Sequence, residues 1–128
     1  MEQEGIVSVW AGVFETDKAL MEYFDDIPAR DIPPFSQDFF GGCDIYPFDI
    51  DFSERSIHEF TTDPEVLVCS HSEGTAIGPE IKKLFPQGLE TPCNAVILVY
   101  NYKYDPEELT PNPNAPVTFL GAVPCDLD

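Results

Sequence analysis

Residues 94–104 read Asn-Ala-Val-Ile-Leu-Val-Tyr-Asn-Tyr-Lys-Tyr and form the longest strand candidate in the chain. Residues 95–100 are an uninterrupted apolar run, so both faces of an extended segment here would be apolar. Beyond this run only Tyr102 and Tyr104 keep an apolar face. The pattern predicts a strand that lies in the middle of a sheet and emerges into solvent at its end.

Further strand candidates lie on both sides of this segment in the sequence. Residues 6–14 are apolar on both faces, which indicates a second interior strand, and Gly12 within it would let another part of the chain pass close by. The remaining strand candidates are short and cover residues 44–51, 65–71 and 117–123. Pro47 cannot donate a ladder hydrogen bond, so we expect the first of these at a sheet edge.

Helix signals separate the strands. Thr16 and Asp17 supply a cap and an acidic first turn, and Ser36 caps a short turn that places the side chains of Phe39 and Phe40 inward. Two further helices are expected, one that starts at Ser53 and is closed by Pro64, and one that is introduced by Gly78-Pro79 and runs through Ile81, Leu84 and Phe85.

These elements predict the fold class. We expect an α+β fold with a mixed or mainly antiparallel sheet of about five strands and two to four short helices packed on it. The 128 residues, 43% of them hydrophobic, suffice for one core and not for two, so residues 1–128 are expected to form a single domain.

The net charge of −18 limits the partners. It repels the phosphates of nucleic acid and the anionic surface of a membrane, so we expect neither as a direct partner. A protein with a basic surface is the partner that this field favours. The alternative is that the charge serves solubility alone.

The remaining composition indicates a cytoplasmic protein. Residues 1–5 are acidic and lead directly into a strand, unlike a secretory signal, and no apolar run approaches the length of a membrane helix. Cys43, Cys69, Cys93 and Cys125 are widely spaced, which fits reduced thiols better than a zinc site or a disulfide framework.

The strongest candidate for a binding surface is an acidic and aromatic block. Residues 15–65 hold 14 carboxylates and three basic groups, and therefore carry −11 of the total charge. The carboxylates predicted to contact a partner alternate with rings, a mixture that suits an interface; they are Asp38, Asp44, Asp49, Asp51 and Glu54, between Phe39, Phe40, Tyr46, Phe48 and Phe52. The alternative is that the rings belong to the hydrophobic core and the acids lie on the solvent-exposed side of the same strands and helices.

Two enzymatic hypotheses compete with a binding function. Asp49, Asp51 and Glu54 could converge on a hard cation, although the segment lacks the glycine and the full ligand series of a calcium loop. Cys69 and His71 would share one face of a strand and could form a thiolate and imidazole pair. No phosphate-binding or dinucleotide-binding glycine motif is present, and we expect no catalytic residue, cofactor or metal.

Five segments, taken in order, resemble one known family. They are Val-Ser-Val-Trp-Ala-Gly-Val-Phe at 7–14, Phe-Ser-Gln-Asp-Phe at 35–39, Asp-Ile-Asp-Phe-Ser-Glu at 49–54, Asn-Ala-Val-Ile-Leu-Val-Tyr at 94–100 and Phe-Leu-Gly at 119–121. The chain resembles the immunity protein 22 family of bacterial polymorphic toxin systems over nearly its whole length.

The resemblance implies a small cytosolic α+β protein that binds and neutralises a cognate toxin, with no chemistry of its own. The positions that match the family pattern are Trp10, Gly12, Asp38, Asp49, Asp51 and Glu54, and Trp10 thereby joins the predicted partner-binding residues. Burial preferences favour a core position for the same ring. The alternatives to an immunity function are a small metal-dependent or thiol enzyme and a regulatory protein-binding module; the oligomeric state is left open.

Overall fold

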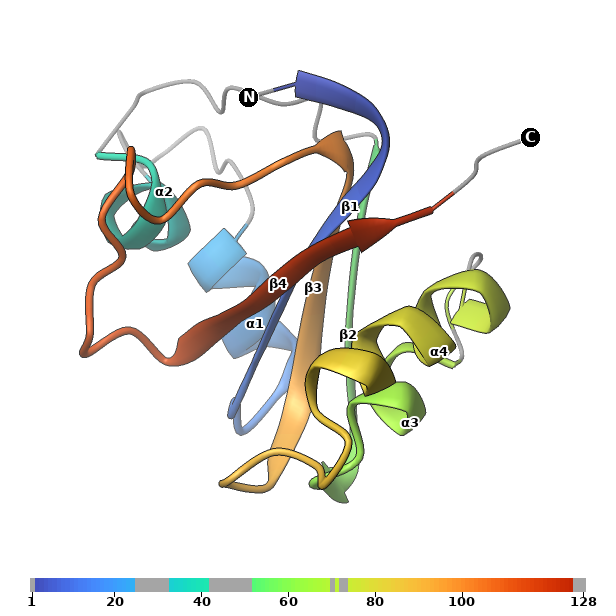
Figure 1. The fold of residues 1–128 in the computed structure, drawn as a ribbon. Coiled ribbons are helices and arrows are strands. Elements are labelled where there is room, and N and C mark those ends of the chain that lie inside the picture. Colours follow the sequence, from blue (N-terminus) through green and yellow to red (C-terminus); the bar gives the residue numbers. More distant parts are fainter. Residues whose placement is uncertain (1, 25–32, 42–51, 70, 72–73, 126–128) are drawn as a thin grey trace.

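The computed structural model describes residues 2–24, 33–41, 52–69, 71 and 74–125, and the fold is given for these. A single antiparallel sheet of four strands in the order β2-β3-β1-β4 forms the centre (Figure 1). The strands are β1 (Glu2–Gly12), β2 (Ser53–Thr61), β3 (Cys93–Tyr102) and β4 (Val117–Pro124). The helices are α1 (Asp17–Phe24), α2 (Pro34–Phe39), α3 (Pro64–Val68) and α4 (Gly74–Leu84). The expected α+β class with an antiparallel sheet is confirmed.

The two most apolar strands lie in the middle of the sheet, as predicted. Residues 94–100 of β3 are all buried, and β1 pairs with β3 on one side and with β4 on the other. Because successive side chains of a strand point to opposite faces, a strand that is apolar throughout needs cover on both faces. The helices supply this cover, α1 and α2 on one face and α3 and α4 on the other (Figure 1).

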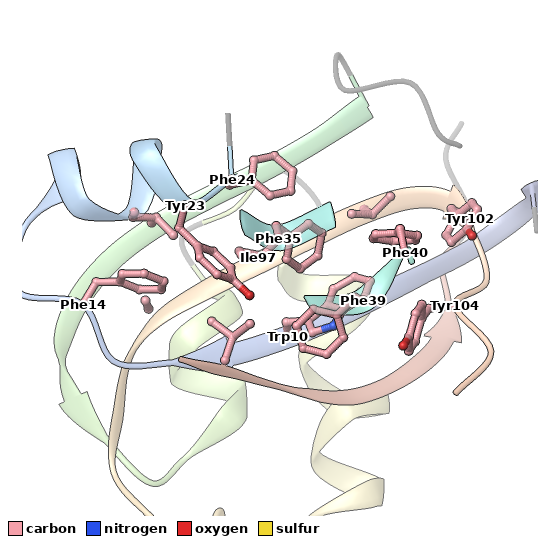
Figure 2. Close-up of a cluster of buried hydrophobic side chains, with 14 residues drawn as sticks. Trp10, Phe14, Tyr23, Phe24, Phe35, Phe39, Phe40, Ile97, Tyr102 and Tyr104 are labelled. Atoms are coloured by element: carbon pink, nitrogen blue, oxygen red, sulfur yellow. The ribbon is translucent and has the colours of Figure 1, made fainter. Parts of the chain in front are cut away.

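The two faces have different cores. The aromatic core lies under α1 and α2 and centres on Trp10, with rings from both helices and from the far end of β3 (Figure 2). Its buried aromatic members are Trp10, Phe14, Tyr23, Phe24, Phe35, Phe39, Phe40, Tyr102 and Tyr104. The aliphatic core on the opposite face is built from Val7, Val9, Ala11, Leu67, Val68, Ile77, Ile81, Val96, Leu98 and Val123, among others.

An irregularity at the end of β3 brings two tyrosines into the aromatic core. Asn101 has a left-handed backbone (φ 58°), and its Oδ1 accepts a hydrogen bond from the Gly5 N–H at 3.1 Å. Regular alternation would place Tyr102 on the face opposite Val99, but both belong to the aromatic core. The Ser8 hydroxyl holds the new register, donating to the Tyr102 carbonyl at 2.7 Å and accepting from the Tyr104 N–H at 2.9 Å.

The close approach expected at Gly12 is confirmed. A Cβ at this position would lie 2.1 Å from the Pro116 carbonyl oxygen and 2.7 Å from the Val117 Cα. Only glycine therefore lets the start of β4 lie against the end of β1.

Two secondary-structure predictions were wrong, and they concern adjacent segments. The segment that starts at Ser53 is strand β2 rather than a helix, because pairing with β3 in the register Ser53↔Val99 overrides the local cap signal. Residues 64–68 form helix α3 rather than a strand. Pro64 opens this helix rather than closing the previous segment, and the Asp63 side chain caps it by accepting from the Glu65 N–H at 3.0 Å.

Two further differences concern the number of strands and the start of α4. The described residues contain four strands where about five were expected; the candidate at 44–51 lies outside them. Helix α4 begins at Gly74, so Pro79 lies inside the helix and not at its start. Ile77 and Ile81, one turn apart on either side of Pro79, are both fully buried in the aliphatic core, which anchors the helix despite the proline.

Candidate partner-binding surface

The residues predicted to bind a partner do not form one cluster in the described structure. Asp44, Asp49 and Asp51 lie outside the described residues. Trp10 lies on central strand β1, Asp38 on α2 and Glu54 on edge strand β2. Each of the three can be placed by its contacts.

Trp10 is a core residue, as its size suggested. Its side chain is 0% exposed, and the ring centroids of Phe35, Tyr104 and Phe39 lie 5.0 Å, 5.4 Å and 5.8 Å away (Figure 2). The ring centroid of Phe119 lies 5.1 Å away. The Trp10 ring does not reach the surface, so it acts on a partner only by supporting residues that do. Within the described residues its Nε1 has no hydrogen-bond acceptor.

Asp38 fastens a loop to helix α2. One carboxylate oxygen accepts from the Tyr23 hydroxyl at 2.7 Å, the other from the Asn112 side-chain amide at 2.8 Å. The Asn112 N–H also donates to the Asp38 carbonyl oxygen at 2.8 Å. The carboxylate therefore holds the proline-rich segment 105–116 against α2.

Glu54 belongs to a network of polar side chains on the opposite edge of the sheet. Its Oε1 accepts from the Tyr100 hydroxyl at 2.6 Å, and its Oε2 lies 3.2 Å from His71 Nδ1. Ser56 Oγ lies 2.7 Å from His71 Nε2 and 2.6 Å from His58 Nε2. We call Glu54, Ser56, His58, His71 and Tyr100 the histidine network.

One arrangement of protons satisfies every bond of the histidine network without a charged imidazole. In it Glu54 accepts from His71 Nδ1–H, and His71 Nε2 accepts from the Ser56 hydroxyl. The Ser56 oxygen then accepts from His58 Nε2–H. Every bond is made with both imidazoles neutral, and burial, followed by the charge that His71 would carry, lowers the pKa of His58.

Ser56, His71 and Glu54 are linked in the order of a hydrolase triad. A catalytic serine needs an open side facing the substrate and oxyanion donors beside it. The Ser56 oxygen is instead shared between two imidazoles. Sequence reasoning missed this network because Ser56 and His58 share a face only in a strand, and residues 53–61 were taken for a helix.

Cys69 and His71 do not lie on one face of a strand, as the proposed thiolate and imidazole pair required. Residues 64–68 are helical, the exposed Cys69 thiol donates to the Val66 carbonyl at 3.1 Å, and the ring nitrogens of His71 face Ser56 and Glu54. Burial raises the pKa of the Cys93 thiol, which reduces its thiolate fraction. Across the part of the chain that the structure describes, no three His, Cys, Asp or Glu side chains gather in a way that could hold a metal ion.

The acidic and aromatic block divides between core and surface. Phe39 and Phe40 are buried in the aromatic core, as the alternative interpretation had it. Phe52 and Phe60, at the two ends of β2, are 52% and 60% exposed, and Glu59 beside Phe60 is exposed as well. Tyr46 and Phe48 lie outside the described residues. Rings of the block therefore reach solvent along edge strand β2.

Two cavities flank the other edge strand, β4. A cavity of about 560 Å³ lies on the face of the aliphatic core, between β4 and the segment that follows α4; its lining includes Leu84, Phe85, Leu89, Glu90, Thr118 and Leu120. A cavity of about 290 Å³ lies on the face of the aromatic core, between β4, α2 and the loop held by Asp38; its lining includes Phe39, Pro106, Pro111, Asn112, Val117 and Phe119. Trp10 and Asp38 thus lie next to the smaller cavity, where they position its wall.

The described residues form an α+β fold on one antiparallel sheet of four strands. The chain belongs to the family described as Immunity protein 22, whose model matches residues 7–125. The resemblance noted in the sequence is thereby confirmed, and membership supports a toxin-neutralising role in general. No curated protein and no solved structure matches the chain. Within the described residues no helix is long and apolar enough to cross a membrane.

Proposed function

We propose that this protein binds one cognate toxin domain in the cytoplasm of the producing cell and its kin, and blocks it by occupying its surface without catalysing a reaction. The observation that carries the proposal is the family match, which covers residues 7–125.

The charge supports a basic toxin surface as the target. A field of −18 accelerates association with a positive groove, and the 14 carboxylates in residues 15–65 concentrate that field in one part of the sequence. A nuclease is the class of toxin that such a field suits, because its substrate-binding groove is built to receive phosphates that carboxylates can imitate. Fast association matters because the inhibitor has to bind the toxin's groove before the cell's own nucleic acid binds there.

The contacts divide the predicted residues by role. Asp38 and Glu54 each hold two neighbours within the protein, and we assign them to positioning the loop at 105–116 and the edge strand β2. Direct contact with the toxin falls to exposed acids and rings, of which Glu59 and Phe60 are examples. A contact role for Asp44, Asp49 and Asp51 stays a prediction.

Co-expression with the toxin domain encoded beside this chain tests the proposal. We expect cells that express the toxin to survive only when this chain is present, and the two products to co-purify. A catalytically dead toxin variant serves as the control, because it should bind without a need for rescue. Death of the co-expressing cells with no complex recovered would remove the immunity function.

A further inference from the structure

The outer edge of β4 carries backbone hydrogen-bonding groups that no described residue bonds. Among the strands that the structure describes, β4 is the last in the order β2-β3-β1-β4 and pairs with β1 alone. Among the described residues, the nearest backbone bonds outside the ladder join Val13 N–H to the Pro116 carbonyl and Cys125 N–H to the Gly5 carbonyl, and both lie on the β1 side. No backbone group outside β1 in the described chain bonds to residues 117–124.

The ladder shows which residues face outward. Antiparallel pairs alternate between pairs that exchange hydrogen bonds and pairs that do not. Because Val13 N–H bonds the Pro116 carbonyl, the next bonded pair is Ala11 with Thr118, and the pairs Gly12 with Val117 and Trp10 with Phe119 are unbonded. Val117 and Phe119 therefore direct their N–H and C=O groups away from the sheet.

The regular part of this edge carries no charge against pairing. Natural edge strands often carry charges, prolines or bulges that prevent the addition of another strand, and here Pro116 and the register shift bound the free edge without interrupting residues 117–119. Val-Thr-Phe-Leu-Gly-Ala-Val-Pro contains no charged residue in a protein of net charge −18, and its proline is at the very end. The register shift opposite Val9 and Trp10 interrupts β4 after Phe119, so the regular edge covers residues 117–119.

The two cavities lie where the side chains of an added strand would point. Residues 117–119 line the smaller cavity on the face of the aromatic core, and residues 118–120 line the larger cavity on the opposite face. Successive residues of a strand point to opposite faces, so two neighbouring side chains of an added strand would each meet one cavity. Figure 1 shows the arrangement, with α2 and the segment before β4 on one side of the strand and α4 on the other.

The charge around this edge selects the occupant. Glu90 lines the larger cavity, Glu107 and Glu108 are exposed on the loop beside the smaller one, and neither lining contains Lys or Arg. The nearby cations of α4, Lys82 and Lys83, are paired with Asp63 at 3.4 Å and Glu80 at 3.0 Å. A second copy of the chain would bring another −18 to this edge, whereas a segment rich in Lys or Arg is attracted to it.

We propose that the toxin adds an extended segment to the outer edge of β4 at residues 117–119, with two successive apolar side chains in the two cavities and Lys or Arg beside them. Strand addition gives affinity through main-chain hydrogen bonds and specificity through the pockets for alternate side chains. The inference rests on the proposed function and adds a contact surface at the sheet edge opposite β2.

Amide hydrogen exchange resolved by NMR tests the pairing directly. In the free protein the amides of Val117 and Phe119 should exchange fast and that of Thr118 slowly, because only Thr118 donates to β1. In the complex with the catalytically dead toxin domain, all three should be slow. A stable complex in which Val117 and Phe119 still exchange fast would contradict strand addition at β4 and leave the proposed immunity function intact. Failure to form any complex would contradict both the strand addition and the immunity function.

A charge substitution provides the second readout. Thr118→Lys places a cation on an exposed position next to both cavities, and should weaken toxin binding by about tenfold or more through repulsion of the basic segment. Met21→Lys adds the same charge to an exposed position on α1 and controls for the change in net charge. Equal affinity of the two variants for the toxin domain would contradict the proposed edge.

Discussion

Asn112 donates its side-chain amide to Asp38 Oδ1 and its backbone N–H to the Asp38 carbonyl oxygen, both at 2.8 Å, across 74 residues of sequence. Two bonds between the same two residues fix both the position and the orientation of the loop relative to α2. Because that loop forms one wall of the smaller cavity, Asp38 acts on the β4 edge without facing it.

Asp38→Ala should therefore loosen the loop as well as destabilise the fold. A hydrogen bond to a charged group contributes about 1.5–3 kcal/mol when it is buried. Asp38 is partly exposed, so water replaces part of both lost bonds, and we expect the free energy of unfolding to fall by about 2 kcal/mol in total. Urea unfolding measures the loss, and limited proteolysis should show new cleavage within residues 105–116. Glu107→Ala removes an exposed carboxylate from the same loop and should change neither; equal behaviour of the two variants would refute the anchoring role.

Asn94 is the second polar anchor, and its removal should be more severe. Its Oδ1 accepts from the Phe14 N–H at 3.0 Å, and its amide donates to the Phe14 carbonyl at 2.7 Å, in a buried position. Asn94→Ala leaves two buried backbone groups without partners, at a cost of about 2–5 kcal/mol. The exposed Asn114→Ala is the matched control, with an expected change below about 0.5 kcal/mol. A similar urea midpoint for both variants would show that water satisfies Phe14 instead.

The difference between local sequence patterns and contacts between distant residues explains how far the sequence predicted the fold. Strands β1 and β3 were predictable because the alternation and the apolar runs are local, and both faces of each strand had to be covered. The state of residues 53–61 depends on pairing with Val99 through Ala95, which lie more than thirty residues away in the chain. A serine followed by polar residues suits a helix start and an edge strand equally well, so local reasoning chose wrongly there.

The site was less predictable than the fold for a related reason. The sequence marked Asp38 and Glu54 as notable acids, but their partners Asn112 and His71 arrive through tertiary contacts. The open edge of β4 follows from the strand order, which no local pattern encodes. What the sequence did show was the family, because short motifs in a fixed order persist even where each is common in kind.

The histidine network predicts a loss of stability on mild acidification. The pKa of His58 is lowered below 6.5 in the folded protein by burial and by His71, so between the two values the unfolded chain binds more protons. The contribution is therefore fully present above about pH 6.5 and declines as the pH falls toward the lowered pKa. Urea midpoints at about pH 7.5 and about pH 5.5 should differ less in His58→Gln than in the unsubstituted protein. An unchanged difference would place the acid sensitivity elsewhere.

Tyr104 gives the corresponding prediction at alkaline pH. Burial, then the neighbouring Tyr102 and Asp105, raises its pKa to about 12, and its hydroxyl donates to the Leu109 carbonyl. Because the folded pKa is the higher one, its contribution to stability is present below about pH 10 and lost as the pH rises toward 12. In an ultraviolet titration of the folded protein, Tyr104→Phe should remove one tyrosine that ionises only at high pH. Retention of that late step in the variant would assign it to another tyrosine.

The proposed encounter with a basic toxin makes a prediction about rates that separates steering from contact. At physiological ionic strength screening reduces the reach of the field to about 8 Å, so the association rate should fall steeply with added salt while the dissociation rate changes little. Asp49→Lys and Glu4→Lys change the net charge equally, but only Asp49 belongs to the block predicted to face the toxin. Stopped-flow association should therefore slow more for Asp49→Lys than for Glu4→Lys at low salt, and the two should converge as salt is added. If both substitutions slow association equally at every salt concentration, the overall net charge steers the encounter, and residues 15–65 contribute no more to it than other charged residues do.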